Sequence, residues 1–305
     1  MSVIVDTVAV AEGVTKAIDD YRNKPEDFVA DFVAPAVDVK TKNGYLPRFG
    51  RMNQKLINYE VDPFAPSPRV DYDLSTTGYA VAVHRGAANL PLELQEFDDT
   101  NLLDAANLGV KVDEALRIER EYSISTILTN AASFTNDSDP GDWTAAGADP
   151  AGDMATAQLA IHAAINRWAN YALMTGDVAM FLRAFVADLR GGGGSVSLAP
   201  MSEVAAYLGV KEARIAAAGY DSAGPGEVSV AASLFGTENL WLFYKPEQMN
   251  AFAPSFMATP RYAPLSRARV WTIDDPEGIM VESRDCYETL LVDETAGYYF
   301  HGVLS

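Results

Sequence analysis

The chain has 305 residues, 49% of them hydrophobic and 21% charged, so it can bury a large core and does not have the composition of a disordered protein. Its 42 acidic and 23 basic residues give a net charge of −19, which argues against a surface made for nucleic-acid phosphates or anionic lipid. One cysteine and three histidines rule out a disulfide framework and leave few metal ligands. With no secretory signal pattern and no apolar run of about eighteen residues, we expect a soluble protein made in a reducing compartment.

The first part of the chain changes its charge abruptly. Residues 1–34 are acidic and predict an arm with a short helix that stops near Pro25. Residues 36–85 hold seven bases and five acids, a charge of +2, whereas residues 86–305 hold thirteen bases and thirty acids, a charge of −17. A basic segment therefore lies within an acidic protein.

That basic segment has the pattern of a β-hairpin. Apolar and polar residues alternate over 57–61 and again over 70–74, on either side of the loop 62–69. Three prolines in the loop cannot donate to a strand ladder, so we expect an irregular, stiff tip. An isolated two-stranded ribbon is marginally stable in water, and we therefore expect it to lie on a neighbouring subunit.

A long helix is predicted next. Apolar residues recur every three or four positions from Leu102 to Ala131, which predicts a rod of about thirty residues and about 45 Å. Asp99 or Thr100 is the expected N-cap. We expect the charged residues between Lys111 and Glu121 to face solvent or another subunit.

Helices and then strands follow the long helix. After a loop over 136–152, helices are predicted over 154–168, 181–189 and 200–208, with Phe181, Leu182, Phe185 and Leu189 as the buried stripe of the second. Strands are predicted at Leu240–Tyr244, Arg269–Ile273, Ile279–Ser283, Tyr287–Val292 and Tyr298–Val303.

Several short motifs resemble catalytic or binding sites but lack a required residue. Gly191–Gly194 is not followed by the Gly-Lys-Ser/Thr of a phosphate loop, so a helix terminator is favoured. Asp137, Asp139 and Asp142 match part of a calcium loop, but its glycine is one position early and Ala148 replaces its last ligand. An adventitious surface ion is the alternative there.

Other candidate groups also favour structural roles. The carboxylate pairs at 98–99 and 274–275 fit a helix start and a proline-containing turn better than a catalytic pair. Cys286 follows Asp285 and lacks the basic cluster of a reactive thiol. The histidines, which are His84, His162 and His301, lie on different predicted elements. We therefore expect no catalytic residue, cofactor or metal site.

The order of these elements resembles the tailed-bacteriophage major capsid proteins, which have the Hong Kong 97-type shell fold. Residues Tyr45–Pro91 are similar to the extended loop of that family, and Asn101–Phe134 to its spine helix, which ends in a Leu-Thr-Asn turn. Val204–Ile215 is similar to a helix, Leu-Gly-Val break and strand of the axial domain. The resemblance covers about residues 30–305 and rests on order and extent.

The resemblance implies an α+β fold with four regions. These are an N-terminal arm (1–35), an extended β-hairpin loop (36–88), a peripheral domain with the spine helix (89–175 and 271–305) and an axial domain (176–270). Four basic residues of the loop would contact neighbouring subunits, namely Arg48, Arg51, Lys55 and Arg69. Lys55 is the only lysine on the predicted hairpin strands, but no partner motif for a covalent cross-link accompanies it.

The resemblance also implies a function, which is a non-enzymatic subunit that assembles with many copies of itself into an icosahedral head around double-stranded DNA. Its partners would be pentamers and hexamers of the same chain, DNA bound without sequence specificity, and scaffold, portal and decoration proteins. It would assemble in the host bacterial cytoplasm, become part of the virion and have no membrane partner. The family often begins with a scaffolding segment of about a hundred residues, which does not precede the arm here, so we expect a separate scaffold or prior cleavage.

Two other functions stay open at this point. An encapsulin-like nanocompartment shares the fold but encloses a cargo enzyme. A soluble acidic enzyme that uses paired carboxylates and a divalent metal belongs to a different class, and it would be a monomer or dimer.

Overall fold

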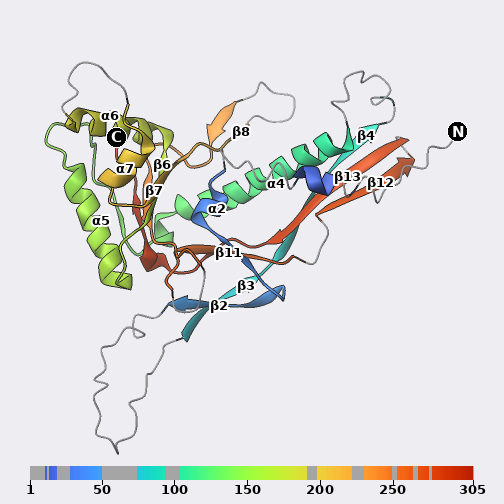
Figure 1. Cartoon of the computed structure of the whole chain (residues 1–305), viewed down its shortest axis with the longest axis horizontal. Coiled ribbons are helices and arrows are strands. Elements are labelled where there is room, and N and C mark those ends of the chain that lie inside the picture. Colours follow the sequence, from blue (N-terminus) through green and yellow to red (C-terminus); the bar gives the residue numbers. More distant parts are fainter. Residues whose placement is uncertain are drawn as a thin grey trace, which may run out of the picture.

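The computed structural model describes residues 11, 14–18, 28–49, 74–91, 93, 104–190, 198–221, 230–248, 253–263, 267–274 and 277–304. Figure 1 shows two bodies joined by the long helix α4 (Ala105–Leu128). One body holds a sheet covered by helices, and the other is an open sheet on which the far end of α4 lies. A separate two-stranded ribbon leaves the middle of the molecule.

The open sheet is built around β13 (Glu277–Tyr287), which pairs antiparallel with β12 (Ala268–Asp274) and with β4 (Ala82–Pro91). The end of β13 also meets β11 (Met257–Arg261), which pairs with β1 (Ala36–Asp38) and β14 (Leu290–Leu291). The predicted strands at 269–273 and 279–283 are thus present but longer. A Cβ at Gly86 would lie 3.0 Å from Val112, so glycine there lets α4 pack closely on β4.

Helix α4 has 24 residues and is therefore about 36 Å long, shorter than expected. It begins at Asp104, whose carboxylate accepts the Asn107 N–H, while the expected caps at 99 and 100 lie outside the described residues. It ends at Leu128 because Asn130 has extended backbone and caps the 3-10 turn η2 (Ala131–Ser133) instead.

The expectation that all charges of α4 face outward was wrong for two residues. Asp113 and Glu121 are fully buried. They are eight positions apart and so lie on one side of the helix. Asp113 accepts a hydrogen bond from Ser283 Oγ at 3.3 Å, on the sheet side of α4.

The main core surrounds the second sheet. Its strands run in the order β5 (Asp137–Ser138), β15 (Gly297–Phe300), β10 (Leu240–Phe243), β6 (Tyr171–Thr175) and β7 (Glu212–Ala216). Every residue of β6 and β10 is buried. The Trp241 indole N–H donates to the Leu128 carbonyl at 2.8 Å, which ties the end of α4 to this sheet.

Three helices cover the second sheet, α5 (Pro150–Ile165), α6 (Gly176–Leu189) and α7 (Met201–Tyr207). The predicted buried stripe of α6 was right for Leu182 and wrong for Leu189. Val178, Leu182 and Val186 are buried four residues apart, whereas Leu189 is 62% exposed. The remaining elements are α2 (Ala30–Val33), β2 (Asn43–Phe49), β3 (Leu74–Ala80), β8 (Gly219–Asp221), β9 (Ala231–Ser233) and η3 (Glu294–Ala296).

The two sheets mix residues from the regions expected to form separate peripheral and axial domains. Strand β15, from the expected peripheral domain, pairs with β10 from the expected axial domain. Strand β11, from the expected axial domain, pairs with β1 and β13 in the open sheet. The division itself stays a prediction.

The turn α2 lies between α4 and the second sheet and bonds to both. On the α4 side, the Glu121 carboxylate accepts the Ala30 N–H at 2.5 Å, and Arg120 pairs with Asp31 at 2.8 Å. Arg120 also donates to the Ala34 carbonyl at 3.4 Å. We call residues 30–34 with these contacts the N-terminal clasp.

On the sheet side of the clasp, Lys245 donates to the Phe32 carbonyl at 2.6 Å. Its ammonium lies 4.8 Å from the Phe32 ring centroid and 4.3 Å from that of Tyr171. The Arg214 guanidinium lies 4.6 Å from the Phe32 ring. Cation–π contacts of this kind add to the apolar packing of Phe32, which is itself buried.

Two groups of the clasp, the buried Glu121 and the partly buried Lys245, have displaced pKa values. Burial raises the pKa of Glu121 from 4.5 to about 7, against the opposing effects of the Ala30 N–H bond and nearby Arg120. Burial also lowers the pKa of Lys245 from 10.5 to about 8, although the carboxylates of Glu212 and Asp31 raise it. Arg214 and Lys211 lower it further.

We predict that Glu121→Gln stabilises the chain above pH 7. The folded state binds the Glu121 proton more tightly than the unfolded chain does. This proton therefore stabilises the folded state fully below pH 4.5, and the stabilisation is lost as the pH rises to about 7. The variant should gain up to about 3 kcal/mol in the free energy of unfolding above that pH and little below pH 4.5. Urea titrations of the unassembled subunit measure this. The matched control Glu114→Gln, on the partly exposed side of α4, should show no such pH dependence.

For Lys245 we predict the opposite effect, a free energy of unfolding that increases with pH in the alkaline range. Because its folded pKa is depressed, the unfolded chain binds more protons between pH 8 and 10.5, and stability rises with pH in that window. Lys245→Met should remove this rise in the same titrations. A free energy of unfolding of the wild-type chain that falls steadily from pH 8 to 10.5 would contradict this prediction.

Candidate functional site

The ribbon of β2 and β3 is the element expected to contact other subunits. Its antiparallel register runs from the pair Asn43–Ala80 to the pair Phe49–Leu74, so residues 50–73 connect the two strands. The strands predicted at 57–61 and 70–74 lie outside the described residues, except Leu74. The described pairing is therefore the root of the expected hairpin.

Two glycine–tyrosine pairs fill the root. Gly44 stands opposite Tyr79 and Tyr45 opposite Gly78. A Cβ at Gly44 would meet the Tyr79 hydroxyl and ring, so the ring lies directly on the glycine backbone. Tyr45 covers Gly78 in the same way and is 75% exposed. Aromatic cover of strand glycines compensates for their missing side chains.

Apolar contacts hold the root against the rest of the chain. Leu46 is buried with Ala258 of β11 and Val292, and the partly buried Val37, Tyr79 and Leu290 pack around them. This cluster is separate from the main core. The root is thus packed on its own subunit.

Polar contacts hold it as well. Arg48 pairs with Asp293 at 3.3 Å and lies 4.0 Å from Glu294. Asp293 is buried and also accepts the Thr295 N–H at 3.0 Å and its hydroxyl at 2.7 Å. On the other strand, the Glu288 carboxylate accepts the Ala80 N–H.

The structure describes only one of the four expected contact residues, Arg48. Arg48 is bound to its own chain, whereas Arg51, Lys55 and Arg69 lie outside the described residues. Their contact with neighbouring subunits stays a prediction. The sequence did not predict that Asp293 and Glu288 bind the ribbon. The only local signal at Asp293 is a threonine two residues later, which indicates no more than a turn.

The acidic loop after α4 uses its carboxylates locally. Asp139 accepts the Gly141 N–H, and Asp142 accepts both the N–H and the hydroxyl of Thr144, which lowers the pKa of Asp142. Asp274 ends β12 opposite Glu277 and is exposed. The glycine run at 191–194, the carboxylates at 98–99 and Asp275 lie outside the described residues.

The histidines lie on separate elements, as predicted. His84 of β4 is 3.0 Å from Glu119 and stacks on Tyr287. His162 of α5 stacks on Trp168, and His301 lies 3.9 Å from Asp137. In the part of the chain that the structure describes, no three His, Cys, Asp or Glu side chains are grouped to hold a metal ion. Among the same residues, no helix is both long and apolar enough to span a bilayer.

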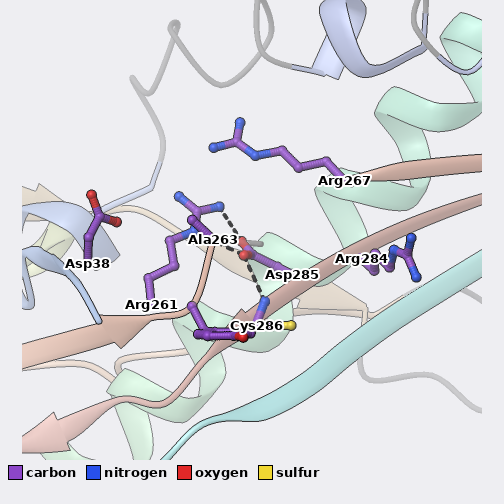
Figure 2. A pocket seen from close by; sticks show the side chains of 8 residues that line it. Asp38, Arg261, Ala263, Arg267, Arg284, Asp285 and Cys286 are labelled. Carbon is purple, nitrogen blue, oxygen red and sulfur yellow. Dashed lines mark hydrogen bonds and ion pairs between the residues drawn. The ribbon is translucent and has the colours of Figure 1, made fainter. Parts of the chain in front are cut away.

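Figure 2 shows a small pocket of about 120 Å³ beside β11 and β13. Arg261 pairs with Asp285 through two hydrogen bonds of 3.0 and 2.5 Å, and the Cys286 N–H donates to the same carboxylate at 2.9 Å. Burial and the nearby Asp285 raise the pKa of Cys286. Arg267, Arg284 and Asp38 also line the pocket, so its lining holds three guanidinium groups and two carboxylates. This arrangement joins β11 to β13 and activates no nucleophile.

We predict unequal costs for the two partners of the ribbon's ion pair. Asp293→Ala leaves the Thr295 N–H and the Arg48 guanidinium without their acceptor and should lower the free energy of unfolding by about 1–3 kcal/mol. Arg48→Ala should cost less than about 1 kcal/mol, because the Arg48 side chain is partly exposed. Thermal unfolding of both variants and of the double mutant measures the difference. Equal costs would contradict this assignment.

The chain was compared with known proteins. No protein-family model and no curated protein sequence matches it. Among solved structures, a phage-related protein from Bordetella bronchiseptica is similar over 95% of this chain and 96% of its own, with a TM-score of 0.72 and 18% identity.

Two other solved structures are similar at lower scores. The capsid of cyanophage P-SCSP1u matches 89% of this chain and 87% of its own, with a TM-score of 0.54 and 10% identity. An encapsulin complex from Synechococcus elongatus matches 90% and 86%, with a TM-score of 0.50 and 9% identity. The predicted fold class is confirmed: the chain has the mixed α+β fold of phage capsid and related shell proteins.

Proposed function

We propose that this chain is the major capsid protein of a tailed bacteriophage, a structural subunit that self-assembles into an icosahedral head around double-stranded DNA. The observation that carries the proposal is the fold, which matches a phage-related protein over nearly the whole of both chains and a cyanophage capsid over most of both. The proposed role is geometric and requires no catalysis.

The ribbon supports this role. Its root is packed on its own subunit through Leu46 and Arg48, while β2 and β3 pair only with each other in the described sheets. The connecting residues 50–73 include Arg51, Lys55 and Arg69. These residues also include four acids, so the connecting loop itself is not net basic, although residues 36–85 carry a charge of +2. In a protein with a net charge of −19, the three bases can pair with carboxylates on another copy.

A nanocompartment shell is the second candidate, favoured by the similarity to the encapsulin complex, which is close in score to that of the cyanophage capsid. The two proposals differ in content. A phage head encloses DNA, whereas a nanocompartment encloses a protein cargo.

We predict that the purified protein forms closed particles by electron microscopy and elutes in the void volume of a size-exclusion column. Particles from infected or lysogenic cells should protect double-stranded DNA from nuclease. Protein cargo without protected DNA would favour the nanocompartment. A stable monomer or dimer that hydrolyses substrate with a divalent metal would overturn both proposals.

We predict that deletion of residues 54–72 leaves soluble subassemblies or aggregates but no closed shells, because the ribbon can no longer reach a neighbour. A triple reversal of Arg51, Lys55 and Arg69 to Glu should also impair assembly, most strongly at low salt.

The matched control reverses three exposed bases outside residues 36–88, Lys111, Lys211 and Arg269, and so changes the net charge equally. Particle yield by sedimentation is the readout. Equal loss in the two triples would show that total charge, rather than the loop, controls assembly.

A further inference from the structure

Helix α5 is apolar on almost every side. Asp153 is the only Asp, Glu, Lys or Arg residue between Pro150 and Ile165, and its carboxylate accepts the Trp143 indole N–H at 2.9 Å. A helix that is hydrophobic all round is normally buried all round. Only one side of α5 is buried in this subunit.

The buried side of α5 packs on residues of its own subunit. Met154, Ala157, Ile161 and Ile165 belong to the main core. Gln158 is buried beside them, where its side chain accepts the Ala169 N–H at 3.0 Å and donates to the Leu208 carbonyl at 3.3 Å. Among the residues that the structure describes, none covers the opposite side in a way that would require its apolar composition.

That opposite side is exposed at the outer edge of the molecule (Figure 1). Leu159 is 59% exposed, and Trp168, just after the helix, is 52% exposed and stacks on His162 with ring centroids 4.3 Å apart. We call this surface the α5 face; its residues are Ala151, Ala155, Thr156, Leu159, His162, Ala163, Arg167 and Trp168.

The charge of the α5 face indicates what covers it. The face has no carboxylate, and its one permanent charge is that of the exposed Arg167. The rest of the chain is strongly acidic, so copies of the chain repel one another over most of their surface and least where a basic, apolar face meets an acidic one. Interface cores are similarly poor in charge and rich in aromatic and Arg side chains.

We propose that the α5 face is a contact between copies of this chain, in which Leu159 and Trp168 are buried and Arg167 pairs with a carboxylate of the second copy. This inference rests on the proposed function and assigns one of its assembly surfaces. Because a basic face does not complement itself, the contact joins two different surfaces. Contacts between two different surfaces generate rings when the rotation closes and open filaments when it does not, rather than closed dimers.

The test compares two leucines of similar exposure on neighbouring helices. Leu159→Glu places a carboxylate in the α5 face, whereas Leu189→Glu places one at the end of α6, where Leu189 is 62% exposed. We expect Leu159→Glu to reduce the particle yield at least about tenfold and Leu189→Glu to leave it near that of the wild type. Circular dichroism and thermal unfolding of the unassembled subunits show whether both variants fold.

A second measurement does not depend on disrupting assembly. Leu159→Cys and Leu189→Cys are labelled with a maleimide in particles and in dissociated subunits; the native Cys286 is buried and serves as the background. Leu159→Cys should react at least about tenfold more slowly in particles than in subunits, because an interface core excludes solvent. Leu189→Cys should react at similar rates in both.

The outcomes separate this inference from the proposed function. Wild-type protein that forms no particles defeats the proposed function. Wild-type particles combined with normal assembly of Leu159→Glu, or with equal labelling of Leu159→Cys in particles and subunits, overturn the α5 contact alone. Equal loss in the Leu159→Glu and Leu189→Glu variants also overturns it, because the effect is then not specific to this face.

Discussion

Strands β2 and β3 pair with each other and with no other described strand, so the ribbon must obtain its stability from contacts outside its own ladder. At the root, Leu46 and the Arg48–Asp293 pair provide those contacts within the subunit. Beyond the pair Phe49–Leu74, the connecting segment carries three further bases. The described end of the ribbon is thus anchored on its own subunit, and contact of the connecting segment with a neighbour is part of the proposed function.

The N-terminal clasp shows the same dependence on a few polar contacts. Residues 30–34 join α4 and the second sheet through Glu121, Arg120 and Lys245. The buried Glu121 and the partly buried Lys245 have pKa values that have moved toward neutrality, to about 7 and about 8. Between those values both groups are charged while buried, and the clasp is least favourable there.

Sequence patterns predicted elements whose two faces differ in polarity. Helices α4 and α6 each have a buried and an exposed side, and the order of the predicted elements indicated the fold class. Strand β6 was not predicted, because it has no polar face and its Ala172, Leu173 and Met174 favour a helix. The equally buried β10 was predicted, because it carries the aromatic residues Trp241 and Phe243. Glu121 was misplaced because a carboxylate is normally assigned to solvent.

The candidate site was less predictable than the fold for a related reason. Arg48 was identified as a contact residue from its charge, but its partner Asp293 lies 245 positions away in the sequence, and no local pattern connects them. The junction between the two bodies is equally invisible to sequence patterns. There the buried Trp241 indole bonds to the Leu128 carbonyl at the last turn of α4. With a lever arm of about 36 Å beyond that junction, a tilt of a few degrees at the indole displaces the far end of α4 by ångströms, so the relative orientation of the two bodies is sensitive to the position of this tryptophan.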